Sequence, residues 1–178
     1  MDALARVRKY DFSTRDSTIE SICKECDVQG LTLISQKAYV LATVDHETNH
    51  TFEPVFEAYF LKNPIRYLKK LRYAPYWGRG FVQLTWLSNY RYYSKLLGVD
   101  LVKNPELASD PAIACYILVH GFRNGIFTGK RLTDYIRAGV TDFIGARRCI
   151  NGKDKAAKIA QQAKEYQAML SRKMRLVA

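Results

Sequence analysis

Apolar residues recur at helical spacing in the first quarter of the chain, between residues that typically begin and end helices. Residues 18–28 (TIESICKECDV) follow Ser17, a preferred N-cap, and stop shortly before Gly30, so they predict one helix. Residues 33–47 predict a second helix, because apolar side chains fall on one face at Ile34, Ala38, Leu41 and Ala42. Glu47 is the last residue of this second helix.

The second half of the chain contains further segments with helical periodicity. Helices are predicted over residues 85–98 (TWLSNYRYYSKLLG), 112–122 (AIACYILVHGF), 132–139 (LTDYIRAG) and 153–175. Asp110 and Pro111 form a favourable N-cap and first-turn pair for the apolar helix that follows them. The last helix is amphipathic, with charges opposite an apolar stripe made by Ala156, Ile159, Ala163, Tyr166 and Leu170.

Two segments lack helical periodicity. Residues 48–75 contain three of the prolines and predict a long loop or lobe with short helical pieces. Residues 76–84 (YWGRGFVQL) have two glycines before an apolar run, which predicts a tight turn followed by a short extended segment. No repeat, low-complexity tract or linker divides the sequence. The pattern therefore predicts a single, mainly α domain over residues 1–178.

Composition agrees with a folded domain and adds an asymmetry of charge. A chain of 178 residues can bury roughly 70% of the surface that its unfolded form exposes, so it needs no disulfides or metal ions to fold. Lys and Arg number 28 against 17 Asp and Glu, a net charge of +11. Residues 1–89 hold 12 basic and 10 acidic groups, whereas residues 90–178 hold 16 and 7. This excess favours nucleic acid, an acidic lipid surface or an anionic wall polymer as partner, and a merely solubilising surface is the alternative.

The start of the chain, MDALARVRKYDF, has scattered charges in place of the apolar run of about 7 to 15 residues that a secretory signal needs. No later run reaches transmembrane length, so we expect synthesis in the cytosol and no stable membrane insertion. A reducing compartment would keep the four cysteines as thiols. Cys23 and Cys26 form C-x-x-C, but on a predicted helix with no preceding strand, which favours buried apolar side chains over a redox or metal role.

Residues 46–50 carry the motif H-E-x-x-H, in which two imidazoles on one helical face could bind zinc. A catalytic zinc site needs a third protein ligand. Extending the motif places Glu53 where a glycine is required and Phe56 where a histidine is required. Residues 58–99 contain no Asp or Glu, and the remaining histidine, His120, lies in an apolar helix. The sequence therefore disfavours a zinc peptidase, and we expect neither a metal nor another cofactor.

Glu47 can serve a different chemistry, because glycoside hydrolysis uses a protonated carboxyl and a second carboxylate. Val40 and Val44 lie on the same side of the predicted helix as Glu47, a setting in which desolvation favours the protonated form. The acid-free stretch of residues 58–99 narrows the choice of the second carboxylate to the acids near the predicted loop. Glu53 and Glu57, in the predicted loop, are the candidates, and the residues alone leave the choice open.

Five segments spanning about residues 38–162 occur in an order that resembles a known family: ATVDHET, PVFEAYF, YWGRGFVQLTWLSNY, GVDLVKNPELASDP and RRCINGKDKAAKIA. They are similar to segments of the family 19 glycoside hydrolases, a group of chitinases and lysozyme-like proteins, and most of all to bacteriophage endolysins. The resemblance implies a mainly α, lysozyme-like domain of two lobes with a substrate cleft and little or no β-sheet. The sequence lacks the disulfide-forming cysteines and secretion signal common in plant chitinases, which disfavours chitin as substrate.

The resemblance also implies roles for individual residues. Glu47 would be the general acid, and Glu57 would be the base that activates water, with Glu53 as the fallback. Thr85 and Asn89 would help to hold the attacking water. The implied substrate-binding residues are His46, Tyr76, Gln83, Asn89, Asn151 and Arg148. One arginine of the pair Arg147 and Arg148 would contact a catalytic carboxylate.

The predicted function is hydrolysis of the β-1,4 bond between N-acetylmuramic acid and N-acetylglucosamine in peptidoglycan, with inversion. Inversion requires the two carboxyls to stand roughly 6.5 to 9.5 Å apart. We expect a monomer that binds peptidoglycan and anionic envelope polymers. As an endolysin it would accumulate in the host cytoplasm and reach the periplasm and cell wall after a separate protein permeabilises the membrane.

Three other functions are each compatible with part of the sequence. A chitinase would act on the neutral N-acetylglucosamine polymer. A nucleic-acid-binding module could use the basic half with Tyr90, Tyr92 and Tyr93, but these cannot share one helical face and no nucleic-acid motif is present, so we expect no nucleic-acid partner. A lytic transglycosylase would need only one acid and leave an anhydro sugar, and the second carboxylate disfavours it.

Overall fold

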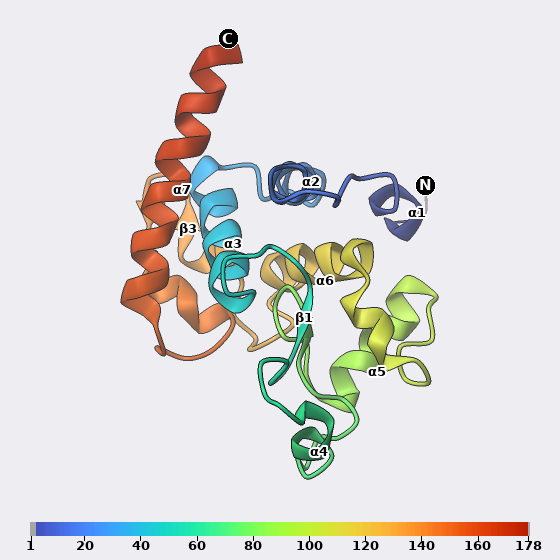
Figure 1. Ribbon diagram of the computed structural model, residues 1–178. Helices are drawn as coiled ribbons and strands as arrows, with labels where there is room; N and C mark the ends of the chain where they lie inside the picture. Colours follow the sequence, from blue (N-terminus) through green and yellow to red (C-terminus); the bar gives the residue numbers. More distant parts are fainter. Residues whose placement is uncertain (1–2, 178) are drawn as a thin grey trace.

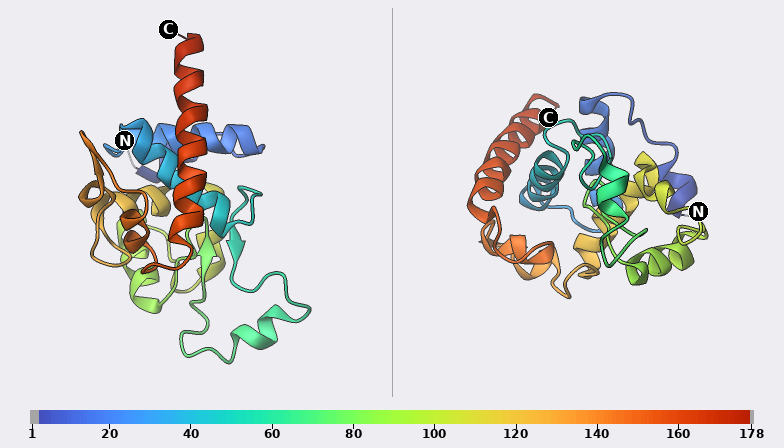
Figure 2. Two further views of the ribbon diagram at one scale, coloured as in Figure 1. Left: turned by 90° about the vertical axis from the view of Figure 1, so that its left-hand side faces the viewer. Right: turned by 60° about the horizontal axis from the view of Figure 1, so that its bottom comes forward.

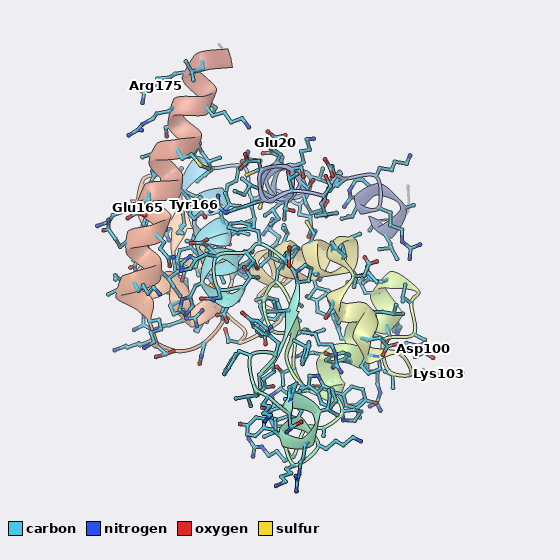
Figure 3. All side chains as sticks on the ribbon, viewed as in Figure 1. Glu20, Asp100, Lys103, Glu165, Tyr166 and Arg175 are labelled. Atoms are coloured by element: carbon cyan, nitrogen blue, oxygen red, sulfur yellow. The ribbon has the colours of Figure 1, made fainter. Side chains whose placement is uncertain are left out.

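Two helices, α3 (Ile34–Glu47) and α7 (Ala156–Val177), pack side by side and form one flank of the molecule (Figures 1 and 2). The computed structural model describes residues 3–177, so both ends of the expected domain lie outside the described residues. The stripe predicted for α7 faces α3, with Ile159 and Ala163 buried, and the charged side chains point outward. The C-terminal end of α7, with Arg175, extends beyond the body (Figure 3).

Local signals explain where the helices begin. α2 (Arg15–Val28) starts earlier than expected, because Thr14 is the N-cap and Ser17, the predicted cap, is the third residue of the helix. The two side chains form a capping box, in which each accepts a hydrogen bond from the other's backbone N–H. The cap predicted for α6 (Pro111–Asn124) is confirmed, since the carboxylate of Asp110 accepts from two first-turn N–H groups.

A lobe of mostly irregular backbone follows α3, at the bottom of Figure 1. It contains β1 (Val55–Phe56), α4 (Pro64–Leu68) and β2 (Arg79–Gly80), and β1 pairs antiparallel with β2 so that Val55 lies opposite Gly80. The predicted loop with short helical pieces is thus confirmed. The expected order of a turn and then an extended segment is wrong for residues 76–84, because β2 precedes a turn that leads Leu84 back to Arg79.

The remaining elements are α1 (Ala3–Val7), α5 (Leu87–Leu97), η1 (Pro105–Ser109), η2 (Leu132–Asp134), β3 (Ile136–Arg137), β4 (Val140–Thr141) and η3 (Gly145–Cys149). The helix predicted over residues 132–139 is wrong. Its first residues form η2, and the rest enter an antiparallel hairpin of β3 and β4. Gly139 has φ of +76°, which allows the tight turn between these strands and prevents the helix from continuing.

The core is built from all the long helices and from the aromatic rings between them. Tyr39 of α3 packs edge-on against Phe122 of α6 and stacks with Phe143. The cysteines are free thiols, and burial raises the pKa of Cys23 to about 11 and that of Cys26 further above its usual value. This agrees with the interpretation of the C-x-x-C pair as packing residues. Within residues 3–177, no helix has the length and apolar character needed to cross a bilayer.

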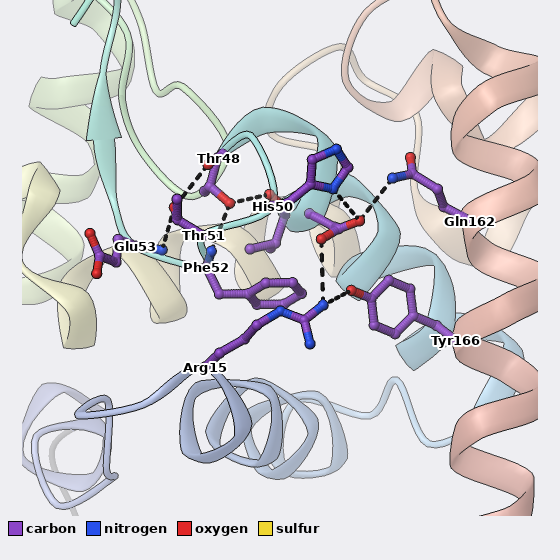
Figure 4. Close-up of polar contacts among 10 residues, drawn as sticks. Arg15, Thr48, His50, Thr51, Phe52, Glu53, Gln162 and Tyr166 are labelled. Atoms are coloured by element: carbon purple, nitrogen blue, oxygen red, sulfur yellow. Dashed lines mark hydrogen bonds and ion pairs between the residues drawn. The ribbon is translucent and has the colours of Figure 1, made fainter. Parts of the chain in front are cut away.

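A buried carboxylate, Asp45, fixes the end of α3, and its partners Arg15, His50 and Gln162 are labelled in Figure 4. Its Oδ2 accepts a hydrogen bond from Gln162 Nε2 of α7 at 2.8 Å and lies 3.0 Å from His50 Nδ1 in the loop after α3. Arg15, at the start of α2, approaches Oδ1 to 3.6 Å and donates to the hydroxyl of Tyr166 at 2.7 Å. Asp45 therefore ties three segments together two residues before Glu47.

Candidate active site

Residues from the end of α3, from the irregular lobe that follows it and from the segment after η3 form the wall of one cavity of about 510 Å³. Glu47 reaches it from the end of α3, and Glu57 reaches it from the residue that follows β1. Among the other predicted site residues, Gln83, Thr85 and Asn151 also line the cavity. The described residues that complete the wall are Tyr73, Gly78, Val82, Trp86 and Ile150.

Glu47 is held by a buried arginine. Arg147 Nη1 donates to Glu47 Oε1 at 2.9 Å, and Arg147 Nε donates to the carbonyl oxygen of Asp154 at 2.9 Å. The Arg147 side chain is 3% exposed and that of Glu47 is 18% exposed. Arg148, predicted as a substrate-binding residue, is exposed and is absent from the described cavity wall, because the turn of η3 directs Arg147 inward instead.

The environment of Glu47 is thus less apolar than the valines alone suggested. A guanidinium favours the charged form of a neighbouring carboxyl, whereas burial favours the neutral form. Only Oε1 is engaged by Arg147, and no described residue donates a hydrogen bond to Oε2. Glu47 therefore has one oxygen fixed by a cation and one that a substrate can contact.

Glu57 is held by neutral donors. The hydroxyl of Tyr73 donates to Oε1 at 2.7 Å, and the backbone N–H of Gly78 donates to Oε2 at 3.1 Å. The Glu57 backbone N–H in turn donates to the Gly78 carbonyl at 2.7 Å. A Cβ on residue 78 would lie 2.7 Å from Gln83 Oε1 and 3.2 Å from Gln83 Cβ, so a larger residue would displace the Gln83 side chain. Glu53, the fallback, is exposed and does not belong to the described wall of the cavity.

Thr85 presents acceptor lone pairs rather than a free hydroxyl hydrogen. Its Oγ1 donates to the Gln83 carbonyl at 2.8 Å, so that a water molecule can donate to the same oxygen. Asn89 lies behind Thr85 and uses its amide to donate to the Thr85 carbonyl at 2.9 Å. Asn89 is absent from the described cavity wall, which ends at Trp86 on this side. Its expected contact with the attacking water stays a prediction.

The backbone of this segment is strained where it meets the cavity. Gln83 has φ of +55° and Trp86 has φ of +76°, conformations that non-glycine residues rarely adopt. Gln83 is stabilised there, since its Nε2 donates to the Val55 carbonyl of β1 at 3.1 Å. Such strain persists only where the surroundings enforce it, and it concentrates at functional sites.

Two other predicted substrate-binding residues lie away from the described wall. The Tyr76 hydroxyl donates to the Val102 carbonyl at 3.3 Å, and the ring packs against Tyr90 with centroids 5.3 Å apart. Tyr76 is therefore part of the scaffold. His46 is half-buried next to Glu47, and burial lowers the pKa of its imidazole.

The geometry of residues 46–50 differs from that of a zinc motif on a continuous helix. α3 ends at Glu47, and His50 has φ of +71°, so the two imidazoles do not share a helical face. His50 lies instead against Asp45. Among residues 3–177, no three His, Cys, Asp or Glu side chains gather in an arrangement that could hold a metal ion.

Two aromatic residues of the cavity wall, Tyr73 and Trp86, were not among the predicted site residues. Trp86 is 42% exposed and lines the cavity, with the Tyr73 ring packed edge-on at 5.1 Å and the Arg72 guanidinium 4.9 Å from its centroid. Trp77 is the buried one of the two tryptophans, covered by Arg79 at 4.4 Å. The only sequence signal for Tyr73 was its place in the aromatic-rich, acid-free segment.

Comparison with solved structures identifies the fold as that of family 19 chitinases. The crystal structure of chitinase C from Streptomyces griseus superposes with a TM-score of 0.64 over 95% of this chain and 75% of that chain, at 19% identity. A second bacterial family 19 chitinase gives a TM-score of 0.58 over 94% of this chain and 92% of that chain, at 20% identity. The expected mainly α, lysozyme-like fold is therefore confirmed.

Sequence comparison finds shorter but closer matches in plants. Chitinase 8 of Oryza sativa subsp. japonica is 45% identical over 49 residues, which cover 28% of this chain and 19% of the rice protein. Endochitinase 1 of Theobroma cacao is 52% identical over 40 residues, which cover 22% of this chain and 12% of the cacao protein. The chain thus matches a fifth or less of these relatives' lengths, and no family model matches it. The resemblance to family 19 is confirmed, and the resemblance to phage endolysins stays a prediction.

Proposed function

We propose that this chain, with its family 19 chitinase fold, is a glycoside hydrolase that cleaves β-1,4 bonds of glycans containing N-acetylglucosamine. The observation that carries the proposal is the cavity between the lobes, where Glu47 and Glu57 face the same space from separate segments. Two such carboxyls are what glycoside hydrolysis requires. The chitinases that share the fold support this reaction class.

In the proposed reaction Glu47 acts as acid and Glu57 as base. A water molecule donates one hydrogen bond to Thr85 Oγ1 and the other to Glu57. Glu57 takes the second proton as the water oxygen bonds to the anomeric carbon, and the glycosidic C–O bond breaks. Glu47 gives its proton to the leaving oxygen, and proton exchange with solvent restores both groups. Direct attack by water inverts the anomeric configuration.

The contact with Arg147 constrains how Glu47 can act. Because Oε1 accepts from the guanidinium, the transferable proton resides on Oε2. After transfer, the negative charge on Glu47 is stabilised by Arg147, which lowers the energy of the state that forms as the bond breaks. Arg147 thus stabilises the carboxylate that forms as Glu47 transfers its proton.

We further propose that the natural glycan is peptidoglycan and that the protein acts as an endolysin. The lobe beside the cavity carries exposed basic side chains with no acid in residues 58–99: Lys62, Arg66, Lys69, Lys70 and Arg72. Such a field raises the local concentration of an anionic polymer and does nothing for a neutral one. Peptidoglycan carries stem-peptide carboxylates, whereas chitin is uncharged, so the charge favours peptidoglycan.

Digestion of purified peptidoglycan and of chitin oligosaccharides in parallel tests the proposal. Products are analysed by mass spectrometry, with and without a chelator. New reducing N-acetylmuramic acid ends, formed equally with chelator present, support a muramidase, that is, hydrolysis of peptidoglycan at N-acetylmuramic acid. Cleavage of chitin alone would support the chitinase, while anhydro ends, free stem peptides or chelator sensitivity would each assign a different reaction.

The ionic-strength dependence separates the two glycans further. Activity on cell walls should fall as the salt concentration rises and the Debye length shrinks from about 10 Å at 0.1 M to about 3 Å at 1 M. Hydrolysis of neutral chitin oligosaccharides should not change. An equal response with both substrates would argue against recognition of an anionic polymer.

A further inference from the structure

We propose that Tyr73 is a positioning residue that orients the carboxylate of Glu57 as the base and fixes it relative to the exposed indole of Trp86. This inference rests on the proposed glycoside hydrolase function and deepens it. Neither the motifs nor the comparisons point to Tyr73. Its role follows from two contacts of its own side chain and one further contact of Glu57.

The first contact is the hydrogen bond to the carboxylate. The Tyr73 hydroxyl donates to Glu57 Oε1 at 2.7 Å, a length typical of a strong bond to a charged acceptor. Burial and the neighbouring Glu57 raise the pKa of Tyr73 to about 12, so the phenol remains a hydrogen-bond donor at neutral pH. A permanent donor holds Glu57 Oε1 in place.

The second contact defines which way the carboxylate faces. Oε2 accepts from the backbone N–H of Gly78, which is itself paired with the Glu57 backbone. One donor on each oxygen fixes the plane of the carboxylate. Gly78 directly precedes β2, and Tyr73 lies in the segment that follows α4. The two donors can therefore fix Glu57 only while these two segments remain packed together.

The third contact links the base to a surface suited to a sugar ring. The Tyr73 ring packs edge-on against Trp86 at 5.1 Å, and both residues line the cavity with Glu57. An exposed indole is a common stacking surface for the apolar face of a pyranose. A sugar ring stacked on Trp86 would therefore be positioned relative to Glu57, because the Tyr73 side chain contacts both residues.

Two substitutions separate these functions of Tyr73. Tyr73→Phe keeps the ring against Trp86 and removes only the donor, so we expect kcat to fall roughly 10- to 100-fold with KM unchanged. Tyr73→Ala removes the ring as well, and KM should then rise in addition.

Tyr67→Phe is the matched control, since this phenol is 48% exposed in the same lobe and lies outside the described cavity wall. It should leave both parameters unchanged, and thermal unfolding of each variant checks that the lobe stays folded. An unchanged kcat in Tyr73→Phe overturns the inference. A rise in KM alone in that variant also overturns it, because it would make Tyr73 a substrate contact.

The inference and the proposed function fail in different ways. If the wild-type chain cleaves neither peptidoglycan nor chitin oligosaccharides, the proposed function fails and Tyr73 has no base to position. If the wild-type chain is active and Glu57→Gln is inactive, while Tyr73→Phe behaves as wild type, only the inference fails.

Discussion

Glu47 and Glu57 face one cavity, but the protein holds them in opposite ways. Glu47 ends a helix whose residues are almost all buried, and its partner is a buried guanidinium. Glu57 follows a strand of two residues, in a lobe whose large apolar side chains are often exposed, and its partners are a phenol and a peptide N–H. One carboxyl is fixed by the core and a charge, and the other by neutral donors of its own lobe.

The difference predicts how each carboxyl responds to change. Substitutions around Glu47 disturb the packing of α3 and a buried ion pair, so they should affect the stability of the whole chain. Substitutions around Glu57 disturb a lobe with little buried core, and such regions open locally at low cost. Activity should therefore be separable from stability on the Glu57 side and coupled to it on the Glu47 side.

The largest expected effect is loss of either carboxyl. Glu47→Gln and Glu57→Gln should each lower kcat about 100- to 10,000-fold on the preferred glycan. Only Glu47→Gln should also lower the free energy of unfolding, by about 1 to 3 kcal/mol, because Arg147 loses its charged partner. Enzyme kinetics and urea denaturation of the same samples measure both quantities.

Glu53→Gln is the control for this pair, since the side chain is exposed and lies outside the described cavity wall. It should retain wild-type activity and stability. If Glu53→Gln is inactive and Glu57→Gln is active, the base has been assigned to the wrong residue.

The next effect concerns the ion pair itself. Arg147→Met should destabilise the protein by about 3 to 5 kcal/mol, because Glu47 and the Asp154 carbonyl both lose a buried donor. Chemical denaturation of this variant and of wild type measures the difference.

Arg148→Met is the matched control for that substitution. Arg148 is exposed, so its removal should change the free energy of unfolding by no more than about 0.5 kcal/mol. Equal destabilisation by both variants would mean that the buried pairing of Glu47 contributes little.

The helices that hold Glu47 could be predicted from the sequence, because their signals are local. Long apolar stripes and the Asp110 cap mark α3, α6 and α7 without any knowledge of their neighbours. The hairpin at residues 136–141 could not be predicted in this way, since strands of two residues show no alternation. LTDYIRAG has helix-like spacing, and the turn at Gly139 decides against it.

The carboxylates of the site and their hydrogen-bond partners also differ in whether a local sequence signal reveals them. Glu47 and Glu57 were found through motifs, whereas their partners depend on contacts between distant segments. Arg147 and Arg148 are adjacent in sequence, and only the turn of η3 determines which one is buried. Tyr73 meets Glu57 because residues 57–78 close on themselves through backbone hydrogen bonds, which no local pattern reveals.

A smaller effect is expected at Asp45, which fixes the end of α3, and it tests whether this residue contributes to stability rather than to catalysis. Asp45→Asn keeps the shape of the side chain and removes its charge, so it should cost about 1 to 3 kcal/mol in the free energy of unfolding. The kcat at low temperature should fall less than in Tyr73→Phe, because Asp45 does not line the described catalytic cavity. Asp27→Asn, whose ion pair with Lys37 is on the surface, should cost less than about 1 kcal/mol.

The smallest effect separates pH effects on the core from those on the cavity. Burial lowers the pKa of His120, which stacks on Tyr116 within α6, below its ordinary value of about 6.5. The unfolded chain therefore binds a proton at higher pH than the folded chain, so His120 lowers stability as the pH falls from about 6.5 through its folded pKa. Urea denaturation across this range should show a shallower loss in His120→Gln than in wild type. The pH dependence of kcat should stay unchanged in that variant, because His120 does not line the described cavity. A changed pH dependence would mean that protonation of His120 affects the reaction in the cavity.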